Sequence, residues 1–140
     1  MIRKVVYFSR SGNAKRIAEK IANHLQLECI QILDHKNWNG FFGYMKAGFY
    51  STANKNVKIS TSKDVGEYDE LIVVTPLWAG SIANATRTFL SMHPREKIHL
   101  VVNSIGSTTT DRDGFRSITD IMNRDLDEDD KIHELISLLK

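Results

Sequence analysis

The chain opens with an apolar run, a polar turn and then a helical pattern. Residues 5–8 (Val-Val-Tyr-Phe) are β-branched or aromatic, which is typical of a buried strand. Beyond the turn, apolar residues recur with the spacing of one helix face, at Ala14, Ile17, Ala18, Ile21, Ala22 and Leu25. The pattern predicts a strand, a loop over residues 9–13 and a helix.

Three later apolar runs predict further strands. Residues 27–33 form a second strand, nearer the edge of the sheet. Residues 71–74 (Leu-Ile-Val-Val) contain no polar position, which indicates a central parallel strand that is covered on both faces. We expect Pro76 to end this strand, because proline has no N–H for the ladder. Residues 98–104 form a fourth strand.

The two segments between the second and third strands have a weaker pattern. Residues 37–50 are rich in Trp, Phe, Tyr and Gly, and the spacing of their large apolar side chains predicts a short helix over residues 42–52. These aromatic side chains can cover the sheet, line a pocket for a flat ring or form a partner surface. Residues 55–65 are mostly polar, so we expect a connector there.

The last part of the chain predicts mainly helices. A helix should follow the loop at residues 75–81, with its apolar face at Ile82, Ala85, Phe89 and Leu90. A helical spacing over residues 115–122 predicts another helix, with a fifth strand missing or vestigial; the alternative is a short edge strand over residues 117–121. Asp127 should cap a final helix whose first turn is acidic, where negative charge suits the helix dipole.

Strands that alternate with helices indicate an α/β fold with a doubly wound parallel sheet. The length of 140 residues suits one domain, so we expect residues 1–140 to form a single domain. In such sheets, ligands bind at the carboxyl ends of the strands where the strand order switches. The loops after the first and third strands should therefore share one pocket.

Composition narrows the function classes. Hydrophobic residues make up 41% and charged residues 26%, and no apolar run reaches the length of a membrane span. The net charge of +2 is too small to indicate nucleic-acid binding. The chain start lacks a signal-peptide pattern and Cys29 has no disulfide partner, so we expect a cytoplasmic protein. The histidines show no metal-ligand spacing, and no catalytic triad or carboxylate pair stands out.

The first loop has the chemistry of a phosphate site. Ser9, Ser11 and Asn13 carry short polar side chains, and Gly12 lets the backbone approach a ligand closely. The start of the following helix adds unpaired N–H groups and a partial positive charge. Arg10 can add charge or point to water. The other interpretation is that Ser11 or Asn13 only caps the helix.

The segment Ser9-Arg10-Ser11-Gly12-Asn13-Ala14 resembles the FMN phosphate loop of flavodoxins, usually written Thr/Ser-x-Thr/Ser-Gly-Asn-Thr. It lacks the Gly-Lys-Ser/Thr ending of a Walker A loop and the three glycines of a dinucleotide fingerprint. The departure from the flavodoxin pattern is Ala14, which lacks the final hydroxyl.

Two later loops extend this resemblance. The segment Thr75-Pro76-Leu77-Trp78-Ala79-Gly80-Ser81 is similar to Thr-Pro-Val-Trp-Ala-Gly-Ser in flavodoxin-like proteins and FMN reductases. This similarity implies that the loop lies along the isoalloxazine ring, with Trp78 against the ring. The alternative is that Trp78 anchors the loop in the core. Ser104, Ile105 and Gly106 match the third flavin loop by position, where backbone groups contact the pyrimidine edge.

The resemblance is to the flavodoxin-like family and covers roughly the first three quarters of the chain. It implies a sheet with strand order 2-1-3-4 and bound FMN. We expect a redox protein that transfers electrons through FMN, with a protein redox partner or a small-molecule donor or acceptor. The alternatives are an NAD(P)H-dependent FMN or quinone reductase and a flavin-free interaction module. Without a fifth strand, the unpaired edge could be covered in a homodimer.

Overall fold

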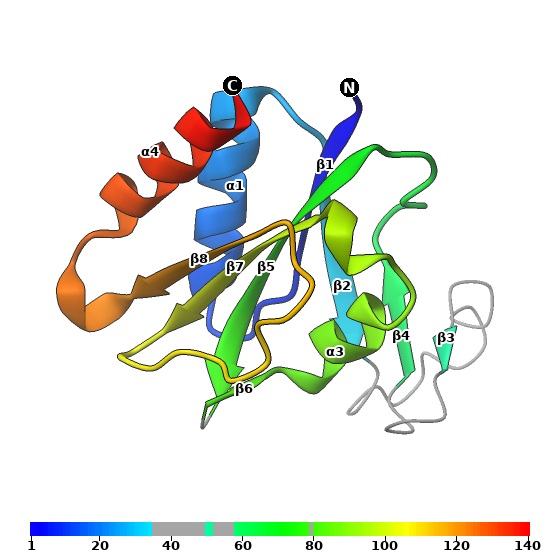
Figure 1. Ribbon diagram of the computed structural model, residues 1–140. Helices are drawn as coiled ribbons and strands as arrows, with labels where there is room; N and C mark the ends of the chain where they lie inside the picture. Colours follow the sequence, from blue (N-terminus) through cyan, green and yellow to red (C-terminus); the bar gives the residue numbers. More distant parts are fainter. Residues whose placement is uncertain (35–49, 52–57, 79) are drawn as a thin grey trace.

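The computed structural model describes residues 1–34, 50–51, 58–78 and 80–140. Its elements follow along the chain in this order: β1 (Arg3–Tyr7), α1 (Asn13–Leu25), β2 (Cys29–Asp34), β3 (Tyr50–Ser51), β4 (Lys58–Thr61), β5 (Glu70–Trp78), β6 (Ser81–Ile82), α3 (Asn84–Leu90), β7 (Ile98–Ser104), β8 (Ser117–Met122) and α4 (Glu128–Leu139). Single 3₁₀ turns at Arg95–Lys97 and Asn123–Asp125 precede β7 and α4. Figure 1 shows the strands in one twisted sheet.

The sheet has the strand order β3-β4-β2-β1-β5-β7-β8, and β6 pairs with β5. The strands from β2 to β8 along this path are parallel to their neighbours. β4 lies antiparallel to β2, and β3 lies antiparallel to β4. The predicted order of the first four parallel strands, 2-1-3-4, is therefore confirmed as β2-β1-β5-β7.

The prediction of a helix over residues 115–122, with no full fifth strand, is wrong. β8 pairs in parallel with β7 from His99↔Ser117 to Ser104↔Met122. Ile118 and Ile121 are three residues apart, so in a strand they point to opposite faces. Each finds an apolar layer there: Ile118 packs on the α3 side and Ile121 is buried on the α1 and α4 side. This two-sided burial imitates helical spacing. The edge of the sheet on this side is now β8, and nothing in the structure tests whether a homodimer covers it.

The connector predicted over residues 55–65 is also corrected, because residues 58–61 form β4 beside β2. Ile59 is fully buried and explains why this short polar segment joins the sheet. The helix predicted over residues 42–52 falls mostly outside the described residues. Its described end, Tyr50–Ser51, is strand β3.

Pro76 does not end β5, which continues to Trp78 and turns back into β6. The N–H of Phe8 donates to the carbonyl oxygen of Val74 at 3.1 Å, so Val74 faces β1. Backbone direction alternates along a strand, and Pro76 therefore faces the same side, beyond the end of β1. Its missing N–H leaves no ladder bond unmade, which is the situation in which strands tolerate proline.

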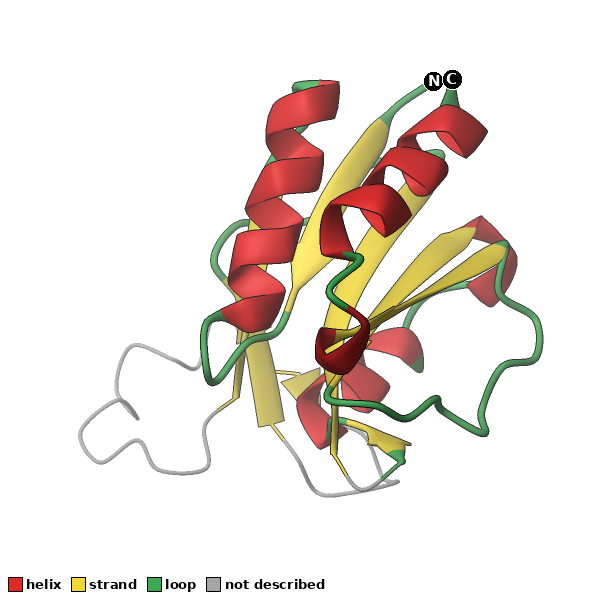
Figure 2. Ribbon diagram, turned by 90° about the vertical axis from the view of Figure 1, so that its left-hand side faces the viewer, coloured by secondary structure: helices red, strands yellow, loops and turns green. Residues whose placement is uncertain are grey.

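Two apolar layers cover the sheet. α1 and α4 pack on one face, side by side in Figure 2, with Ile17, Ile21 and Ile132 among their buried side chains. α3 covers the other face around Phe89. The helical face predicted for α1 is confirmed by the burial of its apolar positions Ala14, Ile17, Ala18, Ile21 and Ala22.

A network of charged residues lies at the end of the sheet where β1, β5, β7 and β8 begin. Glu70 and His99 are only 6% and 3% exposed. Glu70 Oε1 lies 2.9 Å from Arg3 Nε and 3.0 Å from His99 Nε2, and Glu70 Oε2 lies 3.2 Å from Arg116 Nε. Burial alone would raise the pKa of Glu70, but the hydrogen bonds from Arg3 and His99 outweigh it and lower the pKa. This network ties strand ends together far from the loops with candidate chemistry.

Ion pairs join α1 to the start of α4. Asp127 is the N-cap residue, as predicted, but its side chain makes no capping hydrogen bond. Glu128 instead accepts hydrogen bonds from Arg16 Nη2 at 2.6 Å and Lys20 Nζ at 2.8 Å. The bond from Arg16, reinforced by Lys20, outweighs burial and lowers the pKa of Glu128 to about 2.

We expect Glu128→Gln to lower the free energy of unfolding near neutral pH by about 1–2 kcal/mol. The fall in pKa from 4.5 to about 2 corresponds to about 3 kcal/mol. However, the side chains of Arg16 and Lys20 are 45% and 38% exposed, so water screens part of their attraction to Glu128. Because the folded-state pKa is the lower one, this stabilisation is present above pH 4.5 and is lost toward pH 2.

Urea unfolding at several pH values measures this effect. The stability gap between the wild type and Glu128→Gln should narrow as the pH falls through this window. Asp130→Asn is the matched control, because Asp130 lies in the same first turn but has no ion pair within the described chain. A gap of constant size at all pH values would contradict the role of the Glu128 charge.

Candidate functional site

The carboxyl ends of β1, β5 and β7 meet at one edge of the sheet, at the bottom of Figure 1. Tyr7 of β1 pairs with Val74 of β5, which pairs with Val101 of β7. This register brings the three loops of the sequence prediction to the same edge. The first loop leads into α1, the second forms the β5–β6 hairpin and the third begins the connection to β8.

The first loop leaves the start of α1 open. Gly12 is the N-cap residue, and its φ of 96° lies in the left-handed region that favours glycine. Its N–H donates to Ser9 Oγ at 3.0 Å, which holds the loop curled. No side chain of the described residues caps the helix, so the interpretation of Ser11 or Asn13 as a simple cap is not supported. The first N–H groups of α1 remain available to a ligand.

The side chains of this loop differ in their availability. Ser11 is exposed, and within the described chain its hydroxyl has no hydrogen-bond partner. Asn13 Oδ1 accepts a hydrogen bond from Arg16 Nη1 at 2.7 Å, which leaves the amide NH₂ of Asn13 to donate. Ala14 is 1% exposed and its methyl group belongs to the core. Ala14 can therefore face a ligand only through its backbone.

Arg10 connects the first loop to the second. Its Nη2 lies 2.8 Å from Asp34 Oδ2, and its guanidinium carbon lies 5.5 Å from the centre of the Trp78 ring. Trp78 also contacts Phe8 in a T-shaped arrangement, with ring centres 6.1 Å apart. Trp78 is 43% exposed, so it is no core anchor. Sequence reasoning missed Asp34, whose one signal is its position at the end of β2.

The β5–β6 hairpin divides its predicted site residues into two groups. Thr75 is fully buried and its Oγ1 donates to Thr86 Oγ1 on α3 at 2.8 Å; Leu77 is also buried, at 7% exposure. These two side chains serve the core rather than the site. Pro76 is half-buried and Trp78 is exposed at the loop edge. Gly80 has a φ of 79°, in the left-handed region that favours glycine, and Ala79 lies outside the described residues.

In the third loop, the Ser104 side chain forms hydrogen bonds with the backbone of the loop itself. Its Oγ donates to the carbonyl oxygen of Ser107 at 2.7 Å and accepts the N–H of Ser107 at 3.0 Å. The carbonyl of Ile105 accepts the N–H of Arg124 at 3.0 Å, while the Ile105 side chain is 79% exposed. Gly106 lies against Arg124, and a Cβ at this position would come within 2.9 Å of Arg124 Cδ. The loop therefore offers the N–H groups of residues 105 and 106 and one exposed apolar side chain.

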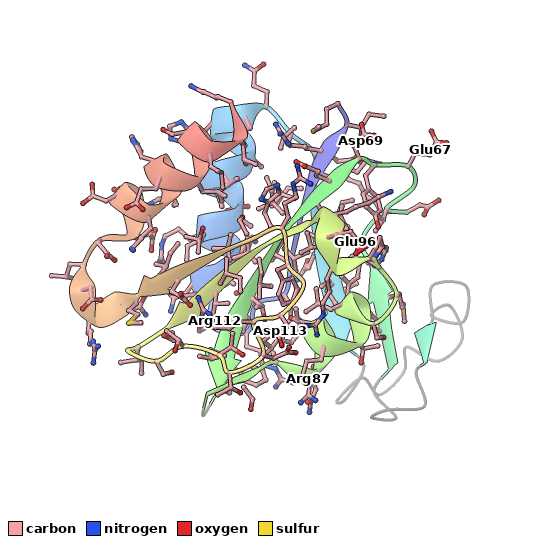
Figure 3. All side chains as sticks on the ribbon, viewed as in Figure 1. Glu67, Asp69, Arg87, Glu96, Arg112 and Asp113 are labelled. Carbon is pink, nitrogen blue, oxygen red and sulfur yellow. The ribbon has the colours of Figure 1, made fainter. Side chains whose placement is uncertain are left out.

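A small pocket of about 130 Å³ adjoins the hairpin. It lies between residues 80–82, Arg87 of α3 and residues 109–111 of the connection to β8. Figure 3 labels Arg87 close to this edge of the molecule. Asp111 at the rim pairs with Arg95 at 2.7 and 2.8 Å. This hydrogen bonding, with the nearby charge of Arg87, outweighs burial and lowers the pKa of Asp111.

These features fit a ligand with a phosphate at one end and a flat ring at the other. The open start of α1 suits a phosphate. The exposed part of the Trp78 ring suits a planar ring, which gains from offset stacking. Within the described ranges, no group of three or more His, Cys, Asp or Glu side chains could hold a metal ion. None of the described helices is long and apolar enough to span a membrane.

Comparison with solved structures gives flavoproteins of the same fold. A candidate flavoprotein from Bacteroides uniformis is 17% identical, with a TM-score of 0.61 over 91% of this chain and 96% of that one. A flavoprotein from Lactobacillus acidophilus in complex with FMN is 16% identical, with a TM-score of 0.53 over 91% and 97%. A candidate flavoprotein from Bacteroides eggerthii is 21% identical, with a TM-score of 0.54 over 76% and 72%. At these identities the likeness establishes the fold, and the predicted flavodoxin-like fold is confirmed.

Neither protein-family models nor curated protein sequences give a match to this chain.

Proposed function

We propose that the protein binds FMN at the carboxyl edge of β1, β5 and β7 and transfers electrons through it. The observation that carries the proposal is the open start of α1 facing the same edge as the exposed ring of Trp78. The complex of the L. acidophilus flavoprotein with FMN, on the same fold, supports this choice of ligand. FMN also matches the loop chemistry, which suits one terminal phosphate.

Bound FMN would supply the redox chemistry, and the chain would supply binding, orientation and charge. Ser11, the amide of Asn13 and the first N–H groups of α1 bind the phosphate. Trp78 orients the ring and keeps water from one side of it. Asp34 holds Arg10 beside Trp78, where the positive charge favours negative charge on a neighbouring ring. The Thr75 hydroxyl acts indirectly, because it fixes β5 on α3.

We further propose a cytoplasmic location and a redox partner that is either a protein or a small molecule. An NAD(P)H oxidation assay separates an electron carrier from an NAD(P)H-dependent FMN or quinone reductase. A carrier should oxidise NAD(P)H no faster than free FMN in the same buffer. A reductase should show saturable turnover that depends on the protein.

The test of the main proposal is a reconstitution with FMN. After removal of free ligand, the purified protein should retain flavin absorption bands at one FMN per chain. FMN at about 100 times its dissociation constant should add about 2.7 kcal/mol to the free energy of unfolding. A colourless protein whose melting temperature ignores excess FMN would overturn the proposal and favour a flavin-free interaction module.

A further inference from the structure

The pocket beside the β5–β6 hairpin, called here the Arg87 pocket, holds a cation that forms no direct ion pair among the described residues, although its charge acts on Asp111 nearby. Arg87 is half-buried at its wall. Among the described residues, no carboxylate lies within ion-pair distance of Arg87. Residues 35–49, 52–57 and 79 contain neither Asp nor Glu. No carboxylate side chain of this chain is thus left to pair with Arg87.

The one acid of the pocket is already committed to another residue. Both carboxylate oxygens of Asp111 accept hydrogen bonds from Arg95, at 2.7 and 2.8 Å. Arg95 is fixed from a second side by the carbonyl oxygen of Asp113 at 3.0 Å and lies over the ring of Phe115. This arrangement holds Asp111 toward Arg95. Within the described residues, the guanidinium of Arg87 has no hydrogen-bond acceptor, so its donors can serve a ligand.

Neutral donors complete the lining. Ser81 and Thr110 are exposed, and within the described chain their hydroxyls have no hydrogen-bond partner. Thr109 is buried and accepts the N–H of Asp111 at 3.1 Å, which fixes the shape of the loop. Ile82 supplies an apolar wall at 3% exposure. A guanidinium with two hydroxyls is the donor set that recognises a phosphate or carboxylate group.

We propose that the Arg87 pocket binds the phosphate or carboxylate group of a small-molecule ligand, as a second anion site separate from the start of α1. The volume of about 130 Å³ suits such a group rather than a whole nucleotide. Ser81 pairs with Trp78 across the hairpin, so the remainder of the ligand would extend toward Trp78. That the ligand would there meet the FMN ring rests on the proposed function, whereas the anion site itself does not.

The first test uses inorganic phosphate and NMR of the ¹⁵N-labelled full chain. Phosphate should shift the amide signals of Ser81 and Thr110 and the Arg87 Nε–H signal in a saturable way, at constant ionic strength. Arg87→Gln should weaken this binding at least about 10-fold, as the loss of one charge-assisted contact predicts. Phosphate at the start of α1 would shift Gly12 instead, and Arg87→Gln should leave that shift unchanged.

Arg112→Gln is the matched control. Arg112 follows Asp111 in the connection from β7 to β8 but lies outside the pocket. Its guanidinium pairs with Asp120 at 2.8 and 3.2 Å. Its replacement should not alter phosphate binding at Ser81 and Thr110. Equal weakening by Arg87→Gln and Arg112→Gln would reduce the site to diffuse surface charge and overturn the proposal. Unchanged binding in Arg87→Gln would overturn it as well.

A second measurement tests the position relative to FMN. Anthraquinone-2-sulfonate, added to oxidised holoprotein, should perturb the flavin absorption with a dissociation constant that rises about 10-fold in Arg87→Gln. The dissociation constant of menadione, which is neutral, should be the same for the wild type and Arg87→Gln. If the chain binds no FMN, the proposed function fails while the phosphate result still stands. If FMN binds but the dissociation constant of the sulfonate is the same in Arg87→Gln, a ligand of this pocket does not reach the flavin.

Discussion

Replacement of both Ser11 and Asn13 by alanine should raise the dissociation constant for FMN by about 100-fold and leave that for riboflavin within about 3-fold. Each of these side chains offers a donor at the open start of α1: the exposed hydroxyl of Ser11 and the amide NH₂ of Asn13. A hydrogen bond to a charged group contributes about 1.5–3 kcal/mol. Two such bonds at the lower end of this range account for the expected loss of about 100-fold. Riboflavin lacks the phosphate and should not be affected.

The measurement is a titration of the purified apoprotein with each flavin, followed by flavin fluorescence. Thr75→Val is an informative control, because Thr75 belongs to the same sequence resemblance but its hydroxyl is bound to Thr86 in the core. This variant should lower the free energy of unfolding by about 1–2 kcal/mol and leave FMN affinity nearly unchanged. Equal losses of FMN and riboflavin in the Ser11 and Asn13 variant would refute a phosphate site at this loop.

The contrast between Ser11 and Thr75 shows where sequence reasoning on the site succeeds and where it fails. Loop positions follow from the topology, because the carboxyl ends of parallel strands share an edge. The resemblance placed all three loops at that edge, and the strand register brings them together. Which side chains face outward depends on tertiary contacts. The hydroxyl of Thr75 donates its hydrogen bond to Thr86, and that of Ser104 to Ser107. No sequence pattern shows these contacts.

The fold shows the same division. α1 was predictable because its apolar positions keep the helical period, and β1, β5 and β7 because each contains an uninterrupted apolar run. The strand over residues 117–121 was only the alternative to a helix, because β8 is buried on both faces and Ile118 and Ile121 therefore imitate helical spacing. β4 was missed because its strand character comes from pairing with β2 and from one buried side chain, Ile59.

The pairings of charged residues were the least predictable part of the site. Arg10 and Asp34 are separated by α1 and β2 in the chain but lie 2.8 Å apart across the sheet edge. Arg87 lies off the apolar face of the predicted helix, and the sequence pattern assigns it no role. Its significance comes from the connection between β7 and β8, which crosses without an α-helix and brings residues 109–111 against it.

Replacement of Trp78 by alanine should weaken FMN and riboflavin equally, by about 30-fold, in contrast to the phosphate-loop variant. The expected loss is about 2 kcal/mol, the stacking of a large ring together with the apolar area that it covers. The fold should persist, since Trp78 is 43% exposed and its described ring contacts are Phe8 and the guanidinium of Arg10. Trp78→Phe should retain most of the affinity because it keeps a planar ring.

Tryptophan fluorescence gives a second readout for the same contact. FMN binding should quench Trp78, and Trp38→Phe removes the signal of the other tryptophan in the chain. In Trp38→Phe the quench should persist, whereas in Trp78→Phe it should largely disappear. A quench that follows Trp38 alone, together with unchanged flavin affinity in Trp78→Ala, would place the ring against another part of the chain. The role assigned to the β5–β6 hairpin would then be wrong, while the phosphate site at α1 would remain to be judged by its own titration.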